Sequence, residues 1–199
     1  VVMPITQSKE KIDTLELLGA DLHLVGATSY SDPNHYIHTA EKLAKKYAKR
    51  EEHGAVWARQ FDNLANMDIH CRTTGAEIWE QTDGTIGALV VGVGTGGTIT
   101  GTARYLKERN PQIEIVGVDP EGSIYTAATD EDVTTYLIEG VGEDFWPETY
   151  DPSITDRYEV VTDAQAFAMT RRLAAEEGLL VGGSCGMAVE GALRVAEED

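Results

Sequence analysis

The feature that most constrains the fold is a run of glycines at residues 92–98, Gly-Val-Gly-Thr-Gly-Gly-Thr. It follows an apolar segment, residues 86–91, whose composition is typical of a buried strand. It leads into residues 98–108, which have the pattern of a helix, and a second apolar segment follows at residues 113–118. A strand, a tight turn, a helix and another strand in this order predict a parallel sheet covered by helices.

The same alternation extends over the rest of the chain. Further helices are predicted at residues 9–18, 37–53, 73–81, 162–178 and from 187, and further strands at residues 1–5, 21–25, 56–61, 159–161 and 179–181. Thr162 and Gln165 have the spacing of a capping box at the start of one helix. We therefore predict an α/β fold of three layers, a mostly parallel sheet with helices on both faces.

Two domains are expected. Residues 1–57 form a smaller N-terminal domain, and residues 58–199 form a larger one that contains the glycine run.

Charge and composition exclude several classes of protein. The chain has 16 basic and 34 acidic residues, a net charge of −18, and would repel a nucleic acid. No apolar stretch approaches the roughly 20 residues of a membrane helix, and the N-terminal residues lack the pattern of a signal peptide. Cys71 and Cys185 lie far apart, so neither a disulfide framework nor a metal site is predicted. These features indicate a cytoplasmic protein without membrane or nucleic-acid partners.

The glycine run is suited to binding phosphate, because backbone amides at the start of a helix point outward at the positive end of the helix dipole. Gly92, Gly94 and Gly97 also satisfy the dinucleotide fingerprint, with Asp119 at the end of the next strand. Thr95 and Thr98 add two hydroxyls, which favour a terminal phosphate monoester over a pyrophosphate. A phosphate ligand, a dinucleotide and a turn without ligand all remain open.

A second glycine turn, residues 182–186, contains Ser184 and matches the nucleophile elbow of hydrolases. Those enzymes place their histidine after the serine, whereas all five histidines of this chain precede Ser184, which argues against a hydrolase. The hydroxyl could instead face a heterocycle nitrogen, or cap the following helix.

Two loops are further candidates. Residues 60–66 form a polar loop whose amides could bind a carboxylate, although an unliganded surface loop fits equally well. Residues 139–147 combine flexible glycines with acidic and aromatic side chains, as at the mouth of a cleft or in a plain turn packed by Trp146.

Taken together, these runs resemble the fold-type II pyridoxal-phosphate enzymes of the cysteine synthase and cystathionine β-synthase family. The segments that carry the resemblance, in the family's order, are MPITQSKEK, LGADL, QFDNLAN, TTGAEIWEQT, VGVGTGGTITGTARYLKERNP, IEGVGEDFWP and LLVGGSCGMAV. The combination of GTGGTITG with the later GGSCG is highly specific. The resemblance implies a fold like that of the tryptophan synthase β subunit, with pyridoxal 5'-phosphate bound by the larger domain.

The resemblance also implies the site residues. A cup for the cofactor phosphate, here called the phosphate cup, is formed by Gly94, Thr95, Gly96, Gly97 and Thr98. Ser184 bonds the pyridine nitrogen, backbone at Gly140 faces the cofactor ring, and Gln60 binds the substrate carboxylate.

The implied reaction is β-replacement on L-serine or an activated serine by a sulfur nucleophile, in a homodimer that takes small amino-acid substrates. A serine hydroxyl does not force a proton onto the ring nitrogen, which suits β-elimination followed by addition of a thiol. Homocysteine is favoured over sulfide because Glu143 and Asp144 would place two negative charges at the mouth. The alternatives are a cysteine synthase using O-acetylserine and sulfide, and a nicotinamide-binding protein.

No catalytic residue is predicted within the chain. The family carries its Schiff-base lysine in a segment upstream of the part matched here, and none of the seven lysines of this chain lies in that motif. We therefore expect the chain to be the C-terminal portion of a catalytic unit, inactive alone.

Overall fold

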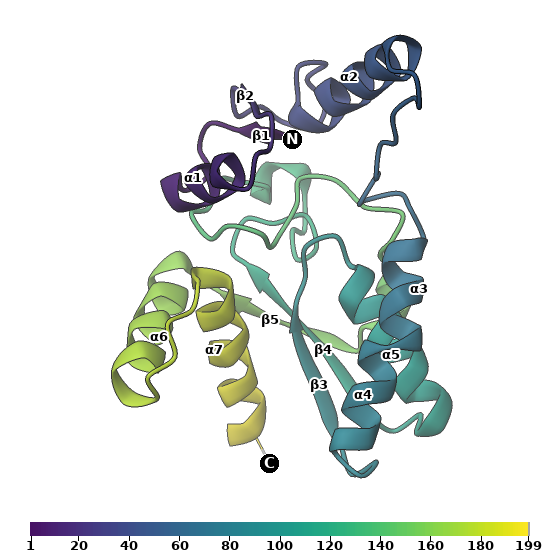
Figure 1. Ribbon diagram of the computed structural model, residues 1–199. Helices are drawn as coiled ribbons and strands as arrows, with labels where there is room; N and C mark the ends of the chain where they lie inside the picture. The colour runs from purple at the N-terminus through teal and green to yellow at the C-terminus, as the bar shows by residue number, and fades with distance from the viewer. Residues whose placement is uncertain (199) are drawn as a thin grey trace. The chain divides into compact units, whose positions relative to one another are not determined.

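The computed structural model describes residues 1–198, so residue 199, the last of the predicted larger domain, lies outside the described residues (Figure 1). The chain divides into two compact units, Val1–Arg59 and Gln60–Asp199. The sequence analysis predicts a division two residues earlier, between residues 57 and 58.

The first unit contains a two-stranded parallel sheet. Strands β1 (Val2–Pro4) and β2 (His23–Val25) pair in parallel and are connected by helix α1 (Lys9–Leu17). Helix α2 (Tyr36–Arg50) follows and packs on β1, where Met3 and Ile37 are buried. Parallel strands need a crossover connection, and α1 provides it.

The second unit contains a three-stranded parallel sheet in the order β3-β4-β5, formed by Ala88–Gly92, Glu114–Pro120 and Arg157–Val161. The central strand β4 has Ile115, Val116 and Val118 fully buried. This burial on both faces explains why β4 reads as a continuous apolar run.

Helices cover both faces of this sheet. Helices α3 (Ala65–Arg72), α4 (Thr74–Gln81) and α5 (Gly97–Arg109) lie on one face, and α6 (Asp163–Glu176) and α7 (Gly183–Glu197) on the other (Figure 1). Short 3₁₀ helices occur at Asp130–Asp132 and Pro152–Ile154. The predicted α/β fold, with three layers and parallel strands, is confirmed.

Two sequence-predicted strands are wrong. Residues 56–61 and 179–181 are not strands, and Val56 and Leu180 are more than nine-tenths exposed. An apolar run forms a strand only where a neighbouring strand makes hydrogen bonds with its backbone N–H and C=O groups. Neither segment pairs with any of the described strands.

Helix α3 is missing from the elements predicted from the sequence. It starts within the expected polar loop, where the Asn63 side chain accepts a hydrogen bond from the Ala65 amide at 3.1 Å. Helix α7 starts at Gly183 rather than at residue 187.

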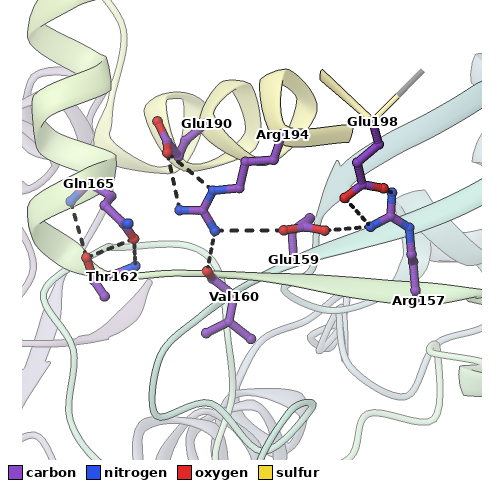
Figure 2. Close-up of polar contacts among 8 residues, drawn as sticks. All are labelled: Arg157, Glu159, Val160, Thr162, Gln165, Glu190, Arg194 and Glu198. Atoms are coloured by element: carbon purple, nitrogen blue, oxygen red, sulfur yellow. Dashed lines mark hydrogen bonds and ion pairs between the residues drawn. The ribbon is translucent and has the colours of Figure 1, made fainter. Parts of the chain in front are cut away.

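Polar contacts cap the start of α6 and hold α7 to the strand β5 (Figure 2). The capping box is confirmed: Thr162 Oγ1 accepts from the Gln165 amide at 3.3 Å, and the Thr162 amide donates to Gln165 Oε1 at 3.0 Å. On α7, the Arg194 guanidinium donates to the Val160 carbonyl of β5 at 2.8 Å. These contacts fix the helix that carries Ser184 against the sheet.

Among residues 1–198, no helix has both the length and the apolar character needed to cross a membrane.

Candidate functional site

The glycine run connects the carboxyl end of β3 to the start of α5. Gly96 is the N-cap of α5 and has a left-handed φ of 76°, which favours glycine. A Cβ at Gly96 would lie 2.2 Å from Cβ of Tyr150, so only glycine fits beside that side chain. The turn is therefore fixed by both backbone conformation and packing.

The amides of the phosphate cup are available to a ligand. In the described part of the chain, no group accepts a hydrogen bond from the amides of Thr95, Gly96 or Thr98, and the Gly97 amide reaches only Thr95 Oγ1, at 3.4 Å. The first amides of a helix have no intrahelical acceptor and lie at the positive end of its dipole. Unpaired amides beside two threonine hydroxyls are a donor set that fits a phosphate monoester.

Two side chains of α3 reach the threonines of the cup. Asn66 Nδ2 donates to Thr95 Oγ1 at 3.0 Å, and His70 Nε2 lies 3.1 Å from Thr98 Oγ1. The other ring nitrogen of His70 lies 2.8 Å from the hydroxyl of Thr74. Sequence reasoning missed Asn66 and His70. Their signal was the four-residue spacing of positions 66 and 70, which predicts a shared helix face once α3 is known to begin at Ala65.

Gln60 is connected to the cup through Asn66. The Asn66 amide group that bonds Thr95 also donates to the Gln60 carbonyl, at 2.7 Å. The Gln60 side chain is exposed. The structure therefore brings Gln60 near the cup by its backbone and leaves its side-chain amide accessible.

The segment around Gly140 lies along the glycine run. A Cβ at Gly94 would stand 2.8 Å from the Gly140 carbonyl oxygen. The Gly142 amide donates to the Val93 carbonyl at 2.7 Å. Gly140 and the cup are thus adjacent although they are far apart in sequence.

Ser184 lies in the first turn of α7, which packs on β3. Met187, three residues later, places its Cε 3.3 Å from a Cβ built at Gly92, so the start of α7 faces the end of β3. Within residues 1–198 the half-buried Ser184 hydroxyl makes no hydrogen bond. The N-cap is Gly182 and α7 has no side-chain cap, so the helix-cap interpretation of Ser184 is wrong.

Asp119 does not suit the dinucleotide interpretation. It is fully buried, and its Oδ2 accepts a hydrogen bond from the Thr126 hydroxyl at 2.8 Å. Burial raises the pKa of Asp119 to about 6. A ribose hydroxyl needs an accessible carboxylate, and Asp119 offers none.

The predicted pair of negative charges at Glu143 and Asp144 is wrong for Glu143. Burial, together with the neighbouring Asp144, raises the pKa of Glu143 to about 8. Glu143 is therefore mostly protonated at neutral pH, because little water reaches its carboxyl group. Asp144 is exposed.

The described part of the second unit contains one lysine, Lys107, near the C-terminal end of α5. Ten residues of helix separate it from the cup, about 15 Å along the axis. Its ammonium group pairs with Asp156 at 2.8 Å. The residues that surround the cup in this unit therefore do not include a lysine.

Comparison with known proteins agrees with this geometry. The family model described as "Pyridoxal-phosphate dependent enzyme" matches residues 1–198. The chain is 42% identical over 202 residues to cystathionine beta-synthase of Oryctolagus cuniculus, covering 100% of this chain and 36% of that protein.

Two further relatives cover 100% of the chain. Cystathionine beta-synthase of Saccharomyces cerevisiae is 37% identical over 207 residues, 40% of its length, and cysteine synthase 2 of Schizosaccharomyces pombe is 38% identical over 218 residues, 55% of its length. The chain thus spans roughly a third to just over half of these relatives. Because the family model covers nearly every residue, the predicted cofactor class is confirmed, and the chain belongs to the family of pyridoxal-phosphate dependent enzymes.

Proposed function

We propose that the chain is the cofactor-binding part of an enzyme that replaces the β-substituent of L-serine, or of an activated serine, with a sulfur nucleophile. One observation carries this proposal. The unpaired amides of the cup, the backbone at Gly140 and the start of α7 all lie near the carboxyl end of β3. Pyridoxal phosphate, when bound, supplies an electron sink for loss and addition at the β-carbon.

In this proposal the phosphate cup binds the cofactor phosphate. The amides of Thr95, Gly96 and Thr98 donate to its oxygens, and the two threonine hydroxyls add further donors. Asn66 and His70 orient these hydroxyls through the contacts at 3.0 and 3.1 Å.

Ser184 is proposed to donate its hydroxyl to the pyridine nitrogen. A neutral hydroxyl does not require the pyridine nitrogen to be protonated, whereas the carboxylate of an aspartate would favour the protonated nitrogen. The role is supported because this hydroxyl has no hydrogen-bond partner among residues 1–198. In this proposal the backbone at Gly140, which lies beside Gly94, would face the ring, and the exposed Gln60 amide would bind the substrate carboxylate.

Homocysteine is the proposed nucleophile, and sulfide, as in a cysteine synthase, is the second candidate. Exposed Asp144 favours a nucleophile that carries an ammonium group and disfavours hydrosulfide. The neutral state of Glu143 weakens this electrostatic preference to a single charge. The relatives include both named activities.

We propose further that the active enzyme is a cytoplasmic homodimer. Its Schiff-base lysine lies outside residues 60–198, because Lys107 is held away from the cup.

The test begins with cofactor binding by residues 1–199 in phosphate-free buffer, followed by visible absorbance. Saturable binding of pyridoxal phosphate, with no effect of NAD, is expected; binding of NAD alone would remove the proposal. In the active enzyme, specificity constants for homocysteine and sulfide are then compared with those of Asp144→Asn. A ratio that does not move toward sulfide would refute the role of Asp144.

A further inference from the structure

Two buried hydroxyl groups, from residues outside the phosphate cup, donate hydrogen bonds to backbone carbonyls of the cup. The Tyr125 hydroxyl donates to the Gly94 carbonyl, and the Thr149 hydroxyl donates to the Thr95 carbonyl at 2.6 Å. Tyr125 is 6% exposed and Thr149 is fully buried. Both come from the long connection between β4 and β5, which the sequence presents only as irregular.

Each of these bonds fixes the direction of one cup amide. No peptide bond within residues 1–198 is cis, and in a trans peptide the carbonyl and the following N–H point in opposite directions. Holding the Gly94 carbonyl outward therefore turns the Thr95 N–H inward. Holding the Thr95 carbonyl does the same for the Gly96 N–H. These are two of the amides that meet no acceptor in the described part of the chain.

The supporting residues are themselves fixed by packing. The Tyr125 ring makes edge contacts with Trp146 and Tyr150, at centroid distances of 5.3 and 5.1 Å. The Thr149 amide donates to the Phe61 carbonyl at 3.1 Å. Burial raises the pKa of Tyr125 far above its usual value, so this hydroxyl remains a donor.

We propose that Tyr125 and Thr149 are positioning residues for a bound phosphate group, acting through the Gly94 and Thr95 carbonyls to aim the Thr95 and Gly96 amides at the anion. The proposal rests on the proposed role of residues 94–98 as a phosphate cup. Preorganised donors bind an anion more tightly because they need not be ordered at the moment of binding.

The test measures the dissociation constant of pyridoxal phosphate, and the amide chemical shifts of Thr95 and Gly96 during titration with inorganic phosphate. Tyr125→Phe and Thr149→Val each remove one hydroxyl with little change of shape. Each is expected to weaken binding about fivefold, the value of one hydrogen bond, and to reduce the phosphate-induced shift of its own amide. Thr149→Ser keeps the hydroxyl and should restore both readouts.

Tyr158→Phe is the matched control, because it removes a half-buried hydroxyl that bonds the Tyr150 hydroxyl and no carbonyl of the cup. Thermal unfolding without ligand is recorded for every variant. Affinity losses of equal size in Tyr158→Phe would assign the effect to general destabilisation and overturn the inference.

The two proposals fail in different ways. If the unaltered chain binds neither pyridoxal phosphate nor phosphate, the cup itself is wrong and the inference falls with it. If the unaltered chain binds and Tyr125→Phe and Thr149→Val bind equally well, the cup stands and the positioning role is refuted.

Discussion

The carbonyl of Gly140 lies so close to Gly94 that a Cβ at position 94 would stand 2.8 Å from the Gly140 oxygen. The Gly140 oxygen belongs to the backbone, so no side chain can rotate away to make room for a Cβ at position 94. This contact brings the proposed ring-facing segment against the proposed phosphate cup.

Gly94→Ala should therefore destabilise the fold by about 1–3 kcal/mol, the usual range for overpacking, and should also lower affinity for pyridoxal phosphate. Gly87→Ala is the control, since a Cβ there has nothing within 4 Å. Chemical denaturation gives the free energy of unfolding, and a titration gives the affinity. If Gly94→Ala and Gly87→Ala have equal free energies of unfolding and equal affinities, the backbone near Gly140 moves aside at no energetic cost.

Ser184→Ala should change the free energy of unfolding by less than about 0.5 kcal/mol, because the hydroxyl neither caps α7 nor bonds the described part of the chain. The active enzyme should nevertheless lose turnover and show an altered cofactor spectrum. Cys185→Ala, at the exposed neighbouring position, should change neither the turnover nor the cofactor spectrum. A Ser184→Ala enzyme with full activity and an unchanged spectrum would rule out a ring-nitrogen role.

Glu143→Gln should stabilise the protein at alkaline pH. The pKa of Glu143 in the folded state, about 8, lies above the ordinary glutamate value of 4.5, so the folded state keeps a proton that the unfolded state loses. Stability from this group is complete below about pH 4.5 and is lost as the pH rises through about 8. Glutamine resembles the protonated acid and does not titrate.

The measurement is the free energy of unfolding of the wild type and of Glu143→Gln between about pH 5 and pH 9. The advantage of the variant should grow with pH and level off above about 8. Exposed Glu148→Gln is the control. A difference independent of pH would mean that Glu143 is ionised at neutral pH.

Thr162→Ala should cost about 1 kcal/mol of stability, since Thr162 Oγ1 caps α6 at the Gln165 amide. Gln165→Ala removes the reciprocal bond to the Thr162 amide. Denaturation of the two single variants and the double variant forms a cycle in which the losses should not add. Strict additivity would show that the two bonds act independently.

Local sequence determined much of the fold. The apolar run of β4, the glycines before α5 and the Thr162–Gln165 pair are patterns whose physical cause lies within a few residues. Burial on both faces, left-handed backbone and helix capping each have a signature in adjacent positions. The same is true of the phosphate cup, which one segment supplies.

The tertiary structure decided what local patterns do not contain. An apolar run at residues 179–181 has the composition of a strand, but a strand also requires a partner elsewhere in the chain. The protonation of Glu143 depends on burial by segments that its own neighbours in sequence do not specify.

The groups around the phosphate cup show this most directly. Asn66, Tyr125 and Thr149 reach it across 29, 31 and 54 residues of sequence, respectively. Their positions follow from the packing of α3 on α5 and from the path of the connection between β4 and β5. The sequence alone determined that an anion could bind at the start of α5, because those amides belong to one turn of chain. Only the folded structure decided which distant hydroxyls and amides hold that turn in place, because a hydrogen bond depends on distance in space and not on separation in sequence.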